Sequence, residues 1–341
     1  MLVGWVAYAV SAVVSAVGEN KLMAAADCAC KVINGNNGFV RDNTSWIIGR
    51  LVRDFESWKH PSAQQCVEHL IREQWKITQA KAPGGRVVPR PIRGGLCISV
   101  YRAKEAKPGH PGRDLPYYTG FLTSILQLAF AAIPIGLFGD WGIMLVTAAG
   151  IILSFASGSL PQWKSEKWAC RGNATKTVVL TKGNGSQHAI VIIGDGKGLD
   201  LEDLAAAGTI MPPPSGHVKL TTMLLAVLWT LLLVTASGIK ENTWFLLLVG
   251  GVGMLQNIYA AGVSRRPEDY GVPLEFVEVI GNPKAMQALF TLEENYPSVG
   301  RSLLTTFFPA DLRRDEKQRW NEYYERAIRL KDEVDDLCRV T

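Results

Sequence analysis

Charged residues are nearly absent from two long stretches of this sequence. Between Asp114 and Lys164 the only charged residue is Asp140, and between Lys219 and Arg265 there are only Lys240 and Glu241. Proton relays and ion pathways through membranes usually need ionisable groups deep within the spans. The absence of such groups disfavours a proton-coupled transporter.

Other absences exclude further classes of protein. The net charge of +5 is modest and does not indicate a nucleic-acid-binding protein. None of the six cysteines has the paired spacing of a zinc finger. The sequence contains neither a Gly-Lys-Ser/Thr phosphate loop nor a complete dinucleotide fingerprint. We therefore expect no metal, no cofactor and no nucleic-acid partner.

The two stretches of low charge predict transmembrane helices. Short turns, Gly139-Asp140 in the first and residues 239–242 in the second, divide each stretch in two. About twenty apolar residues remain on each side, enough to cross a hydrocarbon core of roughly 30 Å. Because a helix satisfies its own backbone hydrogen bonds in lipid, we predict transmembrane hairpins at residues 118–160 and 218–263.

Residues 2–17 carry no charge and form a further candidate span. The alternative is a cleaved signal peptide, with a possible cleavage site at residues 24–26. No Lys or Arg precedes the apolar run, and the possible site lies well beyond its end, which argues against cleavage. We predict a retained first helix at residues 1–17, and so about five transmembrane helices.

Lys and Arg concentrate in three long segments outside the predicted hairpins, residues 18–117, 161–217 and 264–341. The positive-inside rule assigns such segments to the cytoplasm. The predicted fold class is therefore a mainly α-helical, multi-pass membrane protein with a mixed α/β cytoplasmic domain. Its first partner is the lipid bilayer, and the sequence does not identify the organelle.

Hydrophobic periodicity predicts the elements of the cytoplasmic domain. Apolar residues at helical spacing predict helices at residues 45–58, 62–80, 283–296 and 311–339, and β-rich runs predict strands at 96–102 and 273–280. Residues 176–181 and 188–193, joined by Lys-Gly-Asn-Gly-Ser-Gln, predict a β-hairpin. The apolar stripe of the helix at 311–339 suits docking within the chain or on a protein partner.

Arg86, Arg90 and Arg93 belong to a basic run that precedes the first hairpin. One hypothesis is that they bind anionic lipid headgroups, an attraction worth about 1 kcal/mol per basic residue near the membrane surface. The alternative is that they only set the topology, as positive charges beside spans commonly do.

Small residues recur every four positions in two of the predicted spans. Gly150, Ser154 and Gly158 lie on one face of a helix in the first hairpin, and Gly253 and Asn257 do so in the second. Such spacing lets two helices approach closely. We interpret both sets as helix-packing seams.

A Gly-rich segment between a predicted strand and a helix opened by Asp200 is a candidate ligand site. Gly194, Gly196 and Gly198 stand where free backbone N–H groups commonly bind phosphate, although a plain structural turn is the alternative. His188 and Asp195 are candidates for a catalytic acid–base pair. The alternative for a single strand histidine is a simple structural hydrogen bond.

Several strings of this sequence resemble a known family. NTSWIIGRLVRDFESW, FGDWGIMLVTAAG, LPQWKSEKWACR and VVLTKGNGSQHAIVIIGDGKGLDLEDLA are similar to an uncharacterised integral membrane protein family of filamentous fungi, and the resemblance covers nearly the whole chain. It implies a fungal membrane protein, in some cases encoded beside secondary-metabolite genes. It implies no catalytic residues.

These observations support three functional hypotheses. The first is a membrane accessory protein whose cytoplasmic domain binds a partner or a metabolite. The second is a membrane-associated biosynthetic enzyme that uses residues 183–203. The third is a transporter of an apolar metabolite through the helix bundle.

Three Asn-x-Ser/Thr sequons, at Asn43, Asn173 and Asn184, provide a test of the topology. As motifs alone they predict glycosylated lumenal loops, whereas the charge distribution predicts that they are cytoplasmic. We expect glycosidase treatment of the expressed protein to leave its gel mobility unchanged. A mobility shift that disappears in Asn173→Gln or Asn184→Gln would invert the predicted topology.

Overall fold

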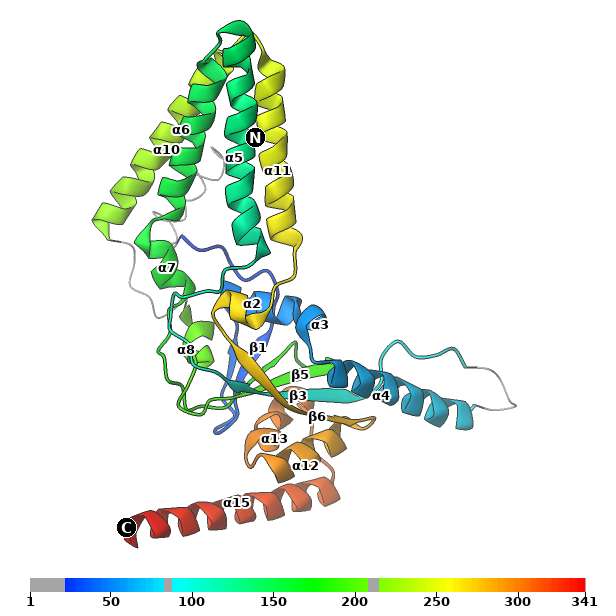
Figure 1. Cartoon of the computed structure of the whole chain (residues 1–341). Helices are drawn as coiled ribbons and strands as arrows, with labels where there is room; N and C mark the ends of the chain where they lie inside the picture. The colour runs from blue at the N-terminus through cyan, green and yellow to red at the C-terminus, as the bar shows by residue number, and fades with distance from the viewer. Residues whose placement is uncertain (1–21, 83–87, 208–214, 341) are drawn as a thin grey trace. The chain divides into compact units, whose positions relative to one another are not determined.

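The computed structural model of the chain describes residues 22–82, 88–207 and 215–340 (Figure 1). The chain divides into two compact units, each assembled from separate stretches of sequence. The helical unit comprises Met1–Ala24, Pro111–Ala169 and Ala207–Arg265, and the sheet unit comprises Ala25–His110, Cys170–Ala206 and Arg266–Thr341. The span predicted at residues 1–17 lies outside the described residues.

Both predicted helix pairs are present in the helical unit. The first pair is α5 (Leu115–Phe138) and α6 (Gly142–Gly158), which the short α7 (Pro161–Lys167) follows, and the second pair is α10 (Gly216–Ser237) and α11 (Thr243–Gly262). Among the described residues, α5, α10 and α11 are each long and apolar enough to cross a membrane. Helix α6 reaches that length only together with α7, across a bend of 45°.

Polar contacts join α5 to α11 at one end of the helical unit and the two turns to each other at the opposite end. Asp114 accepts a hydrogen bond from the Tyr117 N–H at the start of α5 (3.1 Å), and its other carboxylate oxygen pairs with Arg265, just after α11, at 3.1 Å. At the opposite end the Asn242 side-chain amide donates to Asp140 (3.2 Å), so the two turns contact each other. Between these ends, α5 packs against α11 and α6, and α6 packs against α10.

The sheet unit is built around one six-stranded sheet in the order β2-β1-β4-β5-β3-β6. Strands β3 and β5 are parallel, and every other neighbouring pair is antiparallel. The strands are β1 (Lys31–Asn34), β2 (Val40–Asp42), β3 (Leu96–Ala103), β4 (Val178–Thr181), β5 (His188–Ile193) and β6 (Leu274–Asn282). The predicted hairpin is confirmed as β4–β5. Strands β1 and β2 were not predicted, nor was the parallel pairing of β3 with β5.

Helices cover both faces of this sheet, which explains why β3 and β5 are buried along nearly their whole length. One face packs on α12 (Ala285–Asn295), α13 (Val299–Ser302), α14 (Leu304–Phe307) and the start of α15 (Arg314–Val340). The opposite face carries α2 (Trp46–Arg53), α3 (Phe55–Trp58), α4 (Pro61–Ala80) and α8 (Leu201–Ala205). A short 3₁₀ helix, η3 (Pro267–Tyr270), precedes β6.

Two boundaries differ from the prediction for local reasons. The helix predicted at 45–58 is interrupted at Asp54, whose buried carboxylate accepts hydrogen bonds from Arg53 (2.6 Å) and from the Tyr270 hydroxyl (2.9 Å). The helix predicted at 311–339 begins at Arg314, and Trp320 on its first turns is buried in the core with Leu289 and Phe290. That docking within the chain was one of the two alternatives for this helix.

Candidate functional site

A cavity of about 870 Å³ lies within the helical unit, between α5, α6 and α11. Apolar side chains form most of its wall, and Trp229 of α10, almost fully buried, also lines it. The apolar lining includes Phe121, Val146, Ile151, Phe155, Leu246 and Met254. This volume is within the range of pockets that hold drug-sized ligands.

A row of polar side chains follows one face of α5 beside this cavity. Thr119, Thr123 and Gln127 are spaced four residues apart and therefore lie above one another on the helix. Gln256 of α11 donates a hydrogen bond to Thr119 (3.0 Å) and accepts one from Thr123 (3.4 Å), and the Gln127 amide donates to the Val249 carbonyl (2.9 Å). These bonds join α5 to α11 and leave none of the three α5 side chains without a partner.

Asn257 differs from these residues because its side chain makes no hydrogen bond within the described part of the chain. It lines the cavity one residue after Gln256, together with Ser124 and Ser154. Its side chain is exposed. Asn257 therefore offers a donor and an acceptor that a molecule in the cavity can use.

The small residues predicted to form packing seams contribute to this cavity. Gly150, Ser154, Gly253 and Asn257 all line it, and their short side chains leave the space open. A Cβ atom added at Gly150 would lie 3.6 Å from Leu232 of α10, so α6 and α10 are in ordinary contact there. A Cβ added at Gly158 would have no neighbour within 4 Å. Close helix packing at the seams stays a prediction.

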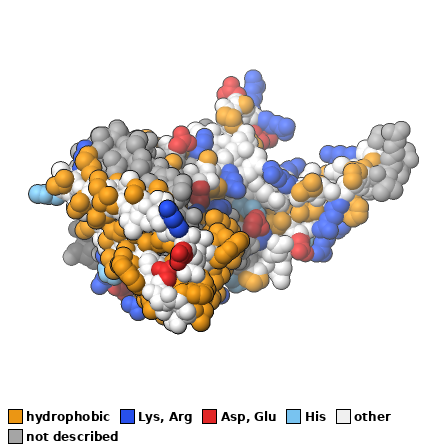
Figure 2. All heavy atoms as spheres, turned by 90° about the horizontal axis from the view of Figure 1, so that it is seen from above, with side chains coloured by type: hydrophobic (Ala, Val, Ile, Leu, Met, Phe, Trp, Pro, Cys, Tyr) orange, Lys and Arg blue, Asp and Glu red, His pale blue; other side chains and the backbone are white. Residues whose placement is uncertain are grey.

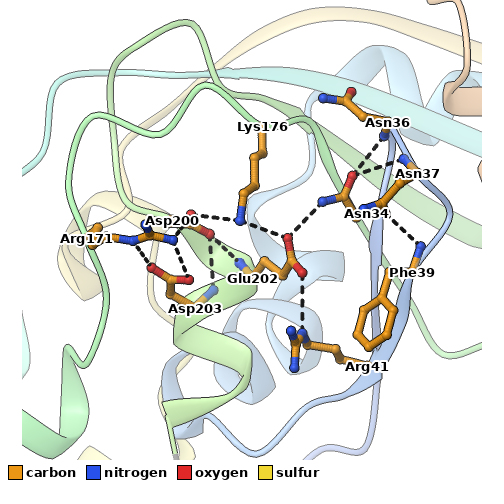
Figure 3. Close-up of polar contacts among 10 residues, drawn as sticks. All are labelled: Asn34, Asn36, Asn37, Phe39, Arg41, Arg171, Lys176, Asp200, Glu202 and Asp203. Atoms are coloured by element: carbon orange, nitrogen blue, oxygen red, sulfur yellow. Dashed lines mark hydrogen bonds and ion pairs between the residues drawn. The ribbon is translucent and has the colours of Figure 1, made fainter. Parts of the chain in front are cut away.

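In the sheet unit, a network of charged side chains surrounds the start of α8 (Figure 3). Asp200 caps the helix by accepting from the N–H groups of Glu202 (3.0 Å) and Asp203 (3.1 Å), while its second oxygen faces Lys176 at 3.3 Å. Arg171 binds Asp203 through two nitrogens, at 2.6 and 3.0 Å. The predicted helix start at Asp200 is confirmed.

Glu202 is nearly buried at the centre of the same network. Its carboxylate accepts from Asn34 (2.8 Å) and Lys176 (3.0 Å) and pairs with Arg41 (3.4 Å). Burial alone would raise the pKa of Glu202, but the hydrogen bonds from Asn34 and Lys176 outweigh it and hold the pKa below its ordinary value. Every carboxylate here has a partner, so the network joins α8 to the sheet and leaves no charge for a ligand.

The Gly-rich turn packs against its own chain, and the N–H groups of Gly194 and Gly196 are hydrogen-bonded within it. Gly194 N–H donates to the Lys176 carbonyl and Gly196 N–H to the Ala174 carbonyl, both at 3.1 Å. A Cβ at Gly194 would lie 2.5 Å from Lys176 O, and Gly196 and Gly198 adopt positive φ angles of 68° and 78°. The glycines are therefore explained by close approach and by left-handed backbone.

We expect Gly194→Ala to destabilise the sheet unit by about 1–3 kcal/mol, because the added methyl group must displace backbone atoms. Gly196→Asn is the matched control: its site is open, and Asn tolerates positive φ, so the cost should stay below about 1 kcal/mol. Thermal unfolding measures both, and added ATP or NAD(P) should stabilise neither. Micromolar nucleotide binding that is lost in Gly196→Val would contradict this.

His188 and Asp195 are not brought together. His188 is the first residue of β5 and Asp195 lies two residues beyond its last, and about 16 Å of extended chain separates the two ends of the strand. His188 instead contacts Glu56, just after the start of α3, with 3.1 Å between Nε2 and the carboxylate, and Lys59 approaches the other oxygen of Glu56 at 2.5 Å. The proposed acid–base pair is therefore replaced by a contact that joins α3 to β5.

Burial of the His188 ring makes stability depend on pH. Burial lowers the pKa of His188 below its ordinary value, against the raising effect of Glu56. As the pH falls below about 6.5, the ordinary pKa of histidine, the unfolded chain therefore binds the proton first, and the free energy of unfolding decreases.

We expect the unfolding temperature of the wild type to be lower at pH 5.5 than at pH 7.5. This range spans the ordinary pKa of histidine. His188→Gln should reduce that fall, because the titrating group is gone. The control is His69→Gln, at an exposed position on α4, which should retain the wild-type dependence. An unchanged pH dependence in His188→Gln would assign it to other groups.

The remaining candidate residues are placed as follows. Arg90 and Arg93 are exposed beside α4, and Arg86 lies outside the described residues. Within the described part of the chain, no group of three or more His, Cys, Asp and Glu side chains has the geometry to hold a metal ion.

No protein-family model, curated protein or solved structure matches the chain.

Proposed function

We propose that this chain is a multi-pass membrane protein whose helix bundle binds an apolar or amphipathic small molecule. The observation that carries the proposal is the 870 Å³ cavity in a unit whose exposed surface is largely hydrophobic (Figure 2). Large apolar side chains exposed on α5, α10 and α11 suit contact with lipid. Trp141 and Trp244 stand exposed at the turns, as interfacial aromatic residues do.

The sheet supports the proposed topology. Its strands come from all three stretches of the sheet unit, and hydrogen-bonded strands of one sheet belong on one side of a membrane. Each inserted helix pair must then cross an even number of times, which favours α6 as a fourth crossing beside the three longer helices. Its 17 residues are at the lower limit for a span. The positive-inside rule assigns the shared side to the cytoplasm.

The distribution of polar groups supports an amphipathic ligand. Gln256, Asn257 and Ser124 line the cavity toward the end of the bundle that carries the Asp114–Arg265 ion pair. Val146, Leu246 and Val249 line it toward the Asp140 turn. A polar group of the ligand would bind near Asn257, with the apolar part of the ligand lying toward the turn. A link to fungal secondary metabolism depends on the resemblance alone.

Binding can be measured with a dansylated fatty acid as the probe on the purified full chain in detergent. We expect saturable binding to the wild type and at least a roughly tenfold weaker affinity in Ser154→Phe, because the new ring occupies the cavity. Ile152→Phe is the matched control, since Ile152 is 66% exposed on the same helix and does not line the cavity. Its affinity should equal that of the wild type.

Three outcomes would overturn the proposal. The first is no saturable binding above the detergent background. The second is equal weakening in both variants while their unfolding temperatures match the wild type. The third is binding that begins only when residues 2–17 are deleted, which would mean that the chain itself fills the cavity.

A further inference from the structure

The second half of α4 extends past the part of the helix that packs on the sheet (Figure 1). Ala63, Val67 and Leu70 are its buried residues, and they pack against Cys97 and Val279. None of its residues after Leu70 is buried. Together with the returning segment at residues 88–93, residues 71–82 form what we call the α4 arm.

The α4 arm is held by its own contacts. The Trp75 indole donates a hydrogen bond to the Val88 carbonyl (2.8 Å), and the Val88 N–H donates to the Gln79 side chain (3.2 Å). Gly94, where the arm ends, approaches so closely that an added Cβ would lie 2.7 Å from the Leu70 carbonyl. The returning segment is therefore fixed beside the helix, and its side chains are presented together with those of α4.

The exposed side chains of the arm combine positive charge with large apolar groups (Figure 2). Ile92 is 91% exposed, and Trp75 and Ile77 are more than a third exposed. Its basic residues are Arg72, Lys76, Lys81, Arg90 and Arg93, and Glu73 is its only acidic residue among those described. Exposed ion pairs with Glu68 and Glu73 offset only Arg72 and Lys76.

We infer that the α4 arm binds the anionic phospholipid surface of the membrane in which the chain is anchored. Basic residues gain from anionic headgroups, while Trp and Ile gain from the boundary between headgroups and acyl chains. A soluble acidic partner would satisfy the charges but not the exposed Ile92. The inference depends on the membrane placement in the proposed function, although not on ligand binding in the cavity.

The test uses the full chain reconstituted in lipid nanodiscs of phosphatidylcholine, with or without phosphatidylserine. Amide hydrogen exchange is followed over residues 71–82 and 88–93. With phosphatidylserine present we expect exchange in the arm to slow by at least about tenfold, and we expect high salt to remove the effect because it screens exposed charges.

The double variant Arg90→Glu/Arg93→Glu should lose this protection. Arg313→Glu/Arg314→Glu makes the same change in charge at another exposed place and should retain it. Exchange in β3 and β5 should equal that of the wild type in both variants, which checks that each variant is folded.

The outcomes separate this inference from the proposed function. A chain that inserts into the discs but shows equal exchange in both lipids overturns the lipid contact and leaves the membrane placement intact. A chain that does not insert overturns the membrane placement itself. Equal protection by a soluble RNA oligonucleotide, without phosphatidylserine, would mean a general polyanion site and would also overturn the assignment.

Discussion

Hydrogen bonds between β3, β5 and β6 join stretches of chain that two apolar helix pairs separate. The α5–α6 pair lies between β3 and β4, and the α10–α11 pair lies between α8 and β6. Strand β5 therefore cannot pair with β3 until the α5–α6 pair has been made, and β6 cannot pair with β3 until both helix pairs have been made. Such non-local pairing is slow, because the entropy of closing a long loop must be lost before any strand contact forms. The sheet therefore brings the ends of both helix pairs back to strands that are hydrogen-bonded to one another.

The helical unit is held by a few polar contacts beside a cavity. Asp114–Arg265 joins α5 to α11, Asp140–Asn242 joins the two turns, and the contacts of Thr119, Thr123 and Gln127 hold α5 against α11. Between these ties the small residues of α6 and α11 do not fill the space that separates the helices. Hydrogen bonds and ion pairs suit this arrangement. A hydrogen bond in apolar surroundings maintains the spacing between helices without large side chains to pack the interior. The cavity therefore results from the small residues and the polar contacts of the two helix pairs.

Periodicity and turn chemistry were sufficient to predict the helix pairs, the β4–β5 hairpin and the cap at Asp200, because each is a local feature of the sequence. Strands β1 and β2 were missed because they have only four and three residues, too few for a reliable alternation. The Glu56–His188 contact joins residues far apart in the chain and has no local pattern. The cavity likewise has no local pattern in the sequence. The spacing of Gly150 and Ser154 shows that they share a helix face, but it does not show whether a neighbouring helix fills the space beside that face. For the glycines of the 194–198 turn, the sequence left two alternatives, a packed structural turn and a phosphate-binding loop. Only their contacts in the structure distinguish the two.

The short length of α6 has a consequence for the membrane placement that we propose. Helix α5, with 24 residues, is about 36 Å long, whereas α6, with 17 residues, is about 25 Å long. If both cross the same bilayer, their hydrophobic lengths disagree, and the longer helix must tilt while the bilayer thins around the shorter one. The endoplasmic reticulum, with a hydrocarbon thickness of about 27 Å, accommodates α6 with less distortion than the plasma membrane at about 32–33 Å. In the placement that we propose, the mismatch at α6 would therefore be smaller in a thin bilayer than in a thick one.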